Sequence, residues 1–218
     1  PNYLMGNAEK IGAAAKSIRD GGFAIIYDGR EREGEADLMF HPEFASMEKI
    51  ERLRKDAGGL ICLAIGKDDA ERMGLGFMTD ALRKSGYAGI VCKRTAYGDE
   101  PAFSLAVNHR SVFTGITDRD RALTISEVAN AVKKKKSREE FQKEFYAPGH
   151  VFLLIGRGLE NRKGHTELGL ELSRRANMPN AIVMCEMLGK GPALGKKEVE
   201  EYAKRNGIPF LEGSDLYA

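Results

Sequence analysis

The run GLICLAIG, residues 59–66, is the feature of the sequence that most limits the possible folds. It is continuously apolar and closed by glycines, which is typical of a strand covered by other layers on both faces. Similar runs alternate along the chain with stretches that show helical spacing of apolar residues. The other strand-like runs are 23–28, 36–41, 102–109, 150–156, 181–188 and 208–212, and the helix-like stretches are 47–56, 124–136, 166–176 and 196–207. The alternation is too irregular to require a parallel doubly wound sheet, so we expect a mixed α+β or three-layer α-β-α domain.

The size and charge of the chain narrow the class of protein. Its 218 residues, 42% of them hydrophobic, predict one domain over residues 1–218 with a sizeable core. The 34 basic and 32 acidic side chains nearly balance, which argues against a nucleic-acid partner and favours a small molecule. No apolar run reaches the roughly 18 residues of a membrane span, and we expect no membrane partner. Three scattered cysteines and the lack of a signal-peptide pattern predict a cytoplasmic location.

The stretch YDGREREGEADL, residues 27–38, is unusually rich in charge for a loop beside a buried strand. If it is extended, Glu33, Glu35 and Asp37 point the same way, because alternate residues of a strand share a face. Carboxylates this close repel, and a bound cation or interleaved arginines relieve the repulsion. Oxygen ligands without cysteine or paired histidine favour Mg²⁺ or Mn²⁺ over zinc. The alternative is a solvated hairpin tip with mutually neutralising charges.

A second cluster, NRKGHTE at residues 161–167, leads into a predicted amphipathic helix. Main-chain N–H groups, the Thr166 hydroxyl and the Arg162 guanidinium at a helix N-terminus form a potential anion site. His165 could titrate there or bind a metal ion. The alternative is an ordinary helix start with an exposed histidine.

Two single residues in strand-like runs are also candidates for chemistry. His150 begins an apolar run after Pro-Gly, either as a rim residue aimed into a cleft or as a histidine satisfied at a strand end. Glu186 interrupts the run VMCEML, and an ionised carboxylate is costly to bury without a partner. It is therefore either a proton donor or acceptor, or a residue on an edge strand that faces water.

The helix-like stretch 124–136 has its own start and end signals. Thr124 and Glu127 form a potential capping box, which predicts that the helix begins there. The lysines at 133–136 complement the helix dipole at the other end, with a phosphate patch as the alternative.

Together the motifs resemble those of the 3,4-dihydroxy-2-butanone 4-phosphate synthase family. They occur in the family's order and run from residue 28 to residue 186. The motifs are DGREREGEAD (28–37), DAGGLIC (56–62), FTGIT (113–117), PGH (148–150), RKGHT (162–166) and CE (185–186). Residues 80–100 contain no motif that aligns with the family.

The resemblance implies a single-domain three-layer α-β-α sandwich with a mixed sheet. It also implies a riboflavin-pathway enzyme that converts D-ribulose 5-phosphate to L-3,4-dihydroxy-2-butanone 4-phosphate and formate. The expected cofactor is Mg²⁺, with Mn²⁺ as an alternative, and the expected assembly is a homodimer with active sites near the subunit interface.

The resemblance also implies roles for residues that match the family motifs. Glu33 and His165 would be the metal ligands. The catalytic positions would be His150, Glu186, Glu35 and Asp28. The substrate-binding positions would be Arg32, Glu33, Asp37, Cys62, Thr117, Arg162, Lys163, Gly164, His165 and Thr166. A nucleophilic role for Cys62 is not needed by this chemistry, so we expect it to be a wall of the pocket.

Overall fold

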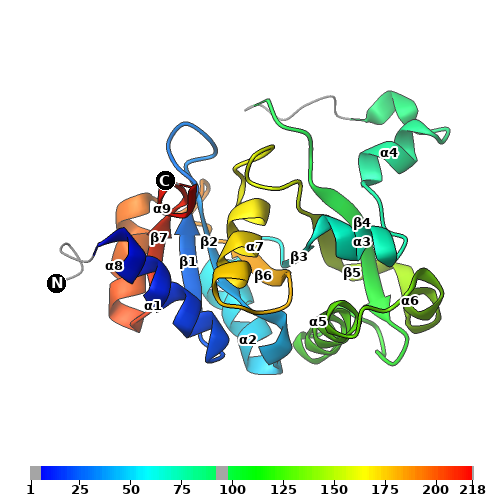
Figure 1. Ribbon diagram of the computed structural model, residues 1–218, viewed down its shortest axis with the longest axis horizontal. Helices are drawn as coiled ribbons and strands as arrows, with labels where there is room; N and C mark the ends of the chain where they lie inside the picture. The colour runs from blue at the N-terminus through cyan, green and yellow to red at the C-terminus, as the bar shows by residue number, and fades with distance from the viewer. Residues whose placement is uncertain (1–5, 92–97, 218) are drawn as a thin grey trace.

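A seven-stranded mixed sheet forms the centre of the computed structural model, which describes residues 6–91 and 98–217 (Figure 1). The strand order is β4-β5-β3-β6-β2-β1-β7. β3 with β5 and β1 with β7 are parallel pairs, and the other neighbours are antiparallel. The strands are β1 (Ala24–Tyr27), β2 (Ala36–Phe40), β3 (Cys62–Ile65), β4 (Phe103–His109), β5 (Phe145–Ile155), β6 (Ala181–Glu186) and β7 (Phe210–Glu212).

Helices cover both faces of this sheet, as Figure 1 shows, so the α-β-α sandwich is confirmed. One face packs against α2 (Met47–Arg52), α3 (Lys67–Arg72), α5 (Asp118–Lys133), α6 (Arg138–Glu144) and α8 (Lys196–Asn206). The other face packs against α1 (Asn7–Arg19), α7 (His165–Arg175) and α9 (Gly213–Tyr217). A further helix, α4 (Met78–Arg83), contacts β4. None of the helices in the described part of the chain has the length and apolar character to cross a membrane.

The register of the strands brings polar residues that are distant in the sequence to the same end of the central strands β2 and β6. Met39, Met184 and Cys62 are aligned across β2, β6 and β3, and all three lie in the core beneath α1 and α7. Two residues farther along, Asp37 of β2 is paired with Glu186 of β6. Side chains two positions apart share a face, so this pair also points to the α7 side of the sheet. The loop between β1 and β2 and the segment before α7 both lie at this same end of the strands (Figure 1).

The structure differs most from the sequence-based prediction at the starts of α5 and β5. α5 begins at Asp118, not at Thr124, because Thr117 caps it by accepting the Asp120 N–H. Thr124 is buried inside the helix, where its hydroxyl accepts the main-chain N–H of His109. β5 begins at Phe145 and is longer than the predicted run, since it continues through the Pro-Gly pair.

Several elements had no counterpart in the prediction. These are the helices α1, α3, α4, α6 and α9 and the short turns 42–44 and 88–90. The helix predicted over 47–56 is present as α2 followed by a wider helical turn, 53–57. Within the stretch 80–100, which carried no motif, residues 92–97 lie outside the described part of the chain, and Cys92 is among them.

Candidate active site

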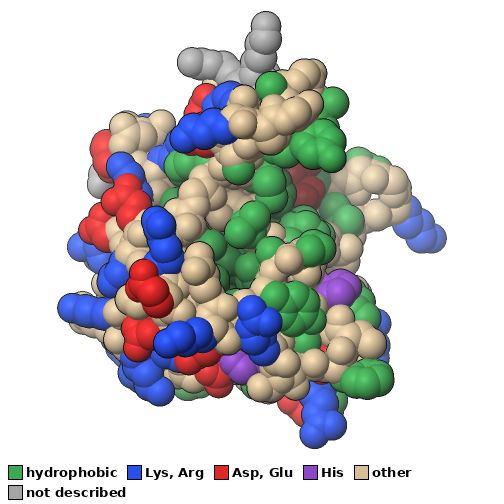
Figure 2. Space-filling model, turned by 90° about the vertical axis from the view of Figure 1, so that its right-hand side faces the viewer, with side chains coloured by type: hydrophobic (Ala, Val, Ile, Leu, Met, Phe, Trp, Pro, Cys, Tyr) green, Lys and Arg blue, Asp and Glu red, His purple; other side chains and the backbone are tan. Residues whose placement is uncertain are grey.

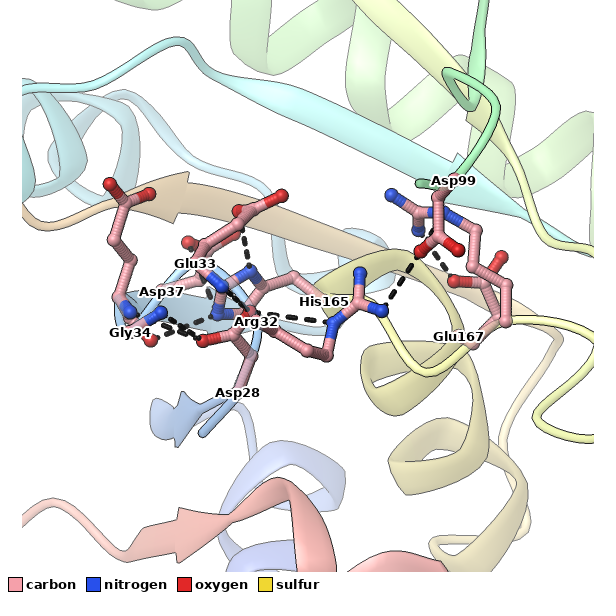
Figure 3. A network of polar contacts seen from close by, with 10 residues as sticks. Asp28, Arg32, Glu33, Gly34, Asp37, Asp99, His165 and Glu167 are labelled. Atoms are coloured by element: carbon pink, nitrogen blue, oxygen red, sulfur yellow. Dashed lines mark hydrogen bonds and ion pairs between the residues drawn. The ribbon is translucent and has the colours of Figure 1, made fainter. Parts of the chain in front are cut away.

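The loop after β1 is shaped by one buried carboxylate. Asp28 is 1% exposed and accepts the main-chain N–H groups of Glu33, Gly34 and Glu35 at 3.0–3.1 Å. Gly34 has φ +70°, a conformation that glycine adopts without strain. The Arg32 Nε lies 3.6 Å from the same carboxylate (Figure 3). Asp28 thus holds the loop in a fixed shape, and the catalytic role expected for it remains a prediction.

His165, the first residue of α7, lies directly against this loop. Its side chain is buried, so the alternative of an exposed histidine at the helix start is wrong. Nδ1 lies 3.7 Å from a Glu33 carboxylate oxygen, and Nε2 lies 3.9 Å from Asp37 Oδ1 and 3.2 Å from the Glu35 carbonyl oxygen. Glu33 and Asp37 therefore approach the imidazole from two sides (Figure 3). The carboxylates gather as predicted, although Glu33 belongs to the turn and β2 begins only at Ala36.

The electrostatics of this cluster favour a positive charge at its centre. Burial lowers the pKa of His165, but the carboxylates of Asp37 and Glu33 outweigh that effect and raise it to about 9. Burial raises the pKa of the Asp37 carboxyl to about 6, against the opposing effect of His165. Ligand atoms of Asp28, Glu33 and His165 lie within 4.8 Å of one another. Two carboxylates and an imidazole suit a divalent cation, and Glu33 is more available than Asp28, whose oxygens already accept main-chain N–H groups.

Glu35 and Glu186 form a carboxyl pair next to this cluster. Burial, together with a hydrogen bond to Glu186 and repulsion from its charge, raises the pKa of Glu35 to about 8. Glu35 therefore keeps its proton near neutral pH beside the Glu186 carboxyl group, which is an arrangement suited to acid and base catalysis. Glu186 is half-buried and belongs to the central strand β6, so the alternative of an edge strand facing water is wrong.

A chain of ion pairs joins the loop to the segment before α7. Asp99 lies between two arginines, 2.8 Å from Arg32 Nη1 and 3.5 Å from Arg162 Nε. Arg162 also forms a 2.6 Å pair with Glu167, and both side chains are buried. A Cβ at Gly164 would lie 2.2 Å from the Arg162 guanidinium, so glycine is needed for this arginine to fold back. Neither Asp99 nor Glu167 was a candidate in the sequence, and only the contacts reveal them.

His150 lies in β5, which is separated from β6 by β3. Two strand spacings separate β5 from β6, so His150 is about 10 Å from Glu186 at the backbone. Its main-chain N–H donates to Asn108 Oδ1 at 2.9 Å, and its Nδ1 lies 3.2 Å from the Asn108 amide. Asn108, at the end of β4, was not a candidate in the sequence because a single buried asparagine gives no distinctive pattern.

The remaining predicted site residues occupy varied positions. Cys62 is buried in the core, and burial raises the pKa of its thiol, which agrees with an unreactive wall position. Thr117 is exposed at the start of α5, and Thr166 is buried in the first turn of α7. The ammonium group of Lys163 lies 4.3 Å from the centre of the Tyr217 ring.

Comparison with known proteins identifies the enzyme class from the fold. The chain superimposes on a two-domain 3,4-dihydroxy-2-butanone 4-phosphate synthase from A. baumannii with a TM-score of 0.79, at 26% identity, covering 94% of this chain and 56% of that one. A synthase solved in complex with two magnesium ions gives a TM-score of 0.78 at 25% identity, covering 94% of both chains. The architecture is therefore that of these synthases.

Sequence comparison then assigns the family. A sequence model described as 3,4-dihydroxy-2-butanone 4-phosphate synthase matches residues 12–218. The synthase of Archaeoglobus fulgidus is 40% identical, covering 92% of this chain and 90% of its own length, and that of Methanosarcina mazei is 39% identical, covering 95% and 90%. The chain belongs to the 3,4-dihydroxy-2-butanone 4-phosphate synthase family, and the enzyme assignment made from its motifs is confirmed.

Proposed function

We propose that this enzyme converts D-ribulose 5-phosphate to L-3,4-dihydroxy-2-butanone 4-phosphate and formate in a Mg²⁺-dependent reaction. The steps would be enediol formation, dehydration, rearrangement of the carbon skeleton and loss of formate. The observation that supports this proposal best is that a cluster of potential metal ligands lies next to a hydrogen-bonded pair of carboxyl groups. Glu33 lies 3.7 Å from His165, and Glu35, which is hydrogen-bonded to Glu186, belongs to the same loop.

Glu33 and His165 would hold the metal ion, with Mg²⁺ expected and Mn²⁺ as the alternative. A divalent cation supplies electrophilic stabilisation of the negative charge that develops on substrate oxygens beside a carbonyl. Asp28 supports this pair indirectly, because its hydrogen bonds to the main chain at residues 33–35 fix the position of Glu33. With only two protein ligands, most coordination positions of the ion are left to substrate and water.

Glu35, Glu186 and His150 would move the protons of the reaction. Glu35, whose pKa is raised to about 8, can give its proton to a leaving hydroxyl and then take one from carbon, with Glu186 as its hydrogen-bond partner. His150 lies on the same side of the sheet as this pair but on a different strand, so it can serve a different carbon of the substrate.

The phosphate group would bind near Arg32 and Arg162, beside the amides at the start of α7. A helix N-terminus and paired guanidinium groups attract an anion together. Asp99 already lies between these two arginines, so the incoming phosphate must compete with its carboxylate.

We also propose that residues 1–218 form a single domain that acts as a homodimer. The outer face of the edge strand β4 carries Phe103 and Leu105, and the loop after it carries Phe113, which is 94% exposed, and Ile116. Hydrophobic side chains gather on this side of the molecule (Figure 2). Exposed apolar residues along an edge strand favour association with a second copy. Light scattering at low protein concentration tests this, and a monomer would contradict it.

Two free, buried thiols among the described residues, Cys62 and Cys185, agree with a reducing compartment, and the cytoplasm is the location we propose.

Incubation with ribulose 5-phosphate, with and without Mg²⁺, tests the proposed reaction. We expect formate in stoichiometric amount with the four-carbon phosphate product, and only when the ion is present. A phosphosugar isomerase or aldolase could use the same cation and phosphate contacts, but it would release no formate. Consumption of the substrate without formate would therefore refute the proposal and favour one of these alternatives.

A further inference from the structure

We propose that Asn108 is a positioning residue that keeps the proton of the neutral His150 ring on Nδ1, so that Nε2 is the nitrogen that accepts a proton from the substrate. This inference rests on the proposed proton-transfer role of His150. Asn108 is 2% exposed and lies at the end of β4, next to β5.

The hydrogen bonds of the Asn108 amide define its orientation. Oδ1 accepts the main-chain N–H of His150 at 2.9 Å, and a main-chain N–H can only donate, so the oxygen faces His150. The amide nitrogen has two protons and two other acceptors, the Tyr146 hydroxyl at 3.0 Å and the Thr114 carbonyl oxygen at 3.5 Å. Nδ1 of His150 is 3.2 Å from both amide atoms. With both amide protons occupied, Oδ1 is the atom left to pair with Nδ1, and it can do so only if Nδ1 carries a proton.

This orientation has a chemical consequence for His150. A proton on Nδ1 leaves the lone pair of the neutral ring on Nε2. When Nε2 takes a proton, the Nδ1–H bond to Oδ1 is kept and strengthened by the positive charge of the ring. The ring can therefore gain and lose a proton without turning, as a residue that acts in successive steps requires.

The surrounding backbone leaves little freedom to the amide. A Cβ at Gly115, whose φ is +97°, would lie 2.1 Å from the Asn108 amide nitrogen, and a Cβ at Gly149 would lie 2.3 Å from its main-chain nitrogen. The loop that contains Gly115 is held by buried Asp120, which accepts the N–H groups of Thr114 and Gly115 at 3.1 and 2.8 Å. Asn108 is thus enclosed on both sides by close backbone contacts.

Nitrogen-15 NMR of the imidazole rings tests the assignment without depending on activity. The chain has four histidines, and loss of one signal pair in His150→Gln assigns His150. For the neutral form of the wild-type ring, we expect the Nδ1 shift in the protonated range and the Nε2 shift in the unprotonated range. In Asn108→Leu the preference should disappear. A wild-type ring with its proton on Nε2, or an unchanged preference in Asn108→Leu, would overturn the proposal.

Kinetic measurements distinguish a positioning role of Asn108 from a purely structural role. We expect Asn108→Leu to lower kcat by about 10²-fold with KM changed less than about 3-fold. Ser104→Ala is the matched control, because it removes a buried hydrogen bond to the Gly76 carbonyl from the same strand, and its kcat should stay within about 3-fold of wild type. Asn108→Asp keeps the acceptor and should retain both the Nδ1 proton and kcat within about 10-fold, whether or not Asn108→Leu folds.

Equal losses of kcat in Asn108→Leu and Ser104→Ala would refute the positioning role, and so would an Asn108→Asp variant without the Nδ1 proton. If the wild-type protein released no formate, the proposed function would fail while the NMR result would still decide which nitrogen carries the proton.

Discussion

Raising the pH should tighten the binding of Mg²⁺ to this protein, because the ion has to displace a proton from His165. The carboxylates around the buried imidazole raise its pKa to about 9, so at pH 7 almost all of the metal-free protein carries that proton. A metal ligand must be deprotonated, and the proton is a competitor of the ion. The apparent affinity should therefore increase about 9-fold from pH 7 to pH 8 and about 50-fold from pH 7 to pH 9, then level off.

Calorimetric titration with Mg²⁺ in two buffers of different ionisation enthalpy measures both quantities, the affinity and the number of protons released. We expect close to one proton per ion from His165 at pH 7. The proton of Glu35 would add to this release, since its pKa is raised to about 8 by burial and by Glu186. His109→Asn, which removes an imidazole from β4, should not change the result. An affinity that stays constant within twofold between pH 7 and pH 9, with no proton release, would refute the assignment of His165 as a ligand.

Four substitutions test other parts of the site. Glu33→Gln should reduce Mg²⁺-dependent turnover below about 1% of the wild-type rate. The melting temperature should change little, because this partly exposed side chain contributes charge to the cluster and little packing. Normal turnover would exclude Glu33 as a ligand. Glu186→Gln should lower kcat by about 10²- to 10⁴-fold at nearly unchanged KM, whereas a higher KM at unchanged kcat would make Glu186 a binding residue. Arg162→Ala should lower the free energy of unfolding by about 3–5 kcal/mol in denaturant titration, because Glu167 would be left buried without its partner; an unchanged midpoint would contradict this. Asp99→Asn should lower the inhibition constant of inorganic phosphate by about 5-fold, and an unchanged constant would place the anion elsewhere.

The strands and the architecture could be predicted because they depend on local hydrophobic patterns. The continuous apolar run at 59–66 became β3 in the middle of the sheet, and the other strand-like runs became strands with bounds shifted by a few residues. The start of α5 was predicted wrongly because two threonines offer N-cap signals. Thr117 forms the cap, and Thr124 bonds to the main chain of β4 inside the folded protein. Such a choice depends on tertiary contacts that local spacing does not contain.

The acidic loop and the histidine of the site could be found from their motifs, but their partners could not. Asp99 contacts Arg32, and Asn108 contacts His150, in each case across a long separation in the sequence. Neither Asp99 nor Asn108 stands in a distinctive sequence pattern. Arg162 was predicted as a phosphate contact. In the structure this guanidinium already forms a buried ion pair with Glu167. Burial and pairing are properties of the whole fold, so a sequence reveals the charged residue but not how much of its charge is already neutralised.

The central position of β6 has a consequence for how the protein is made. In the order β4-β5-β3-β6-β2-β1-β7, this strand lies between two groups of three strands and is hydrogen-bonded to both. It is also the second last of the seven strands along the chain, at residues 181–186. A ribosome therefore finishes nearly all of both halves before the strand that joins them emerges. Until then each half exposes an unpaired edge, so the nascent chain is prone to aggregation before residues 181–186 have been made and paired.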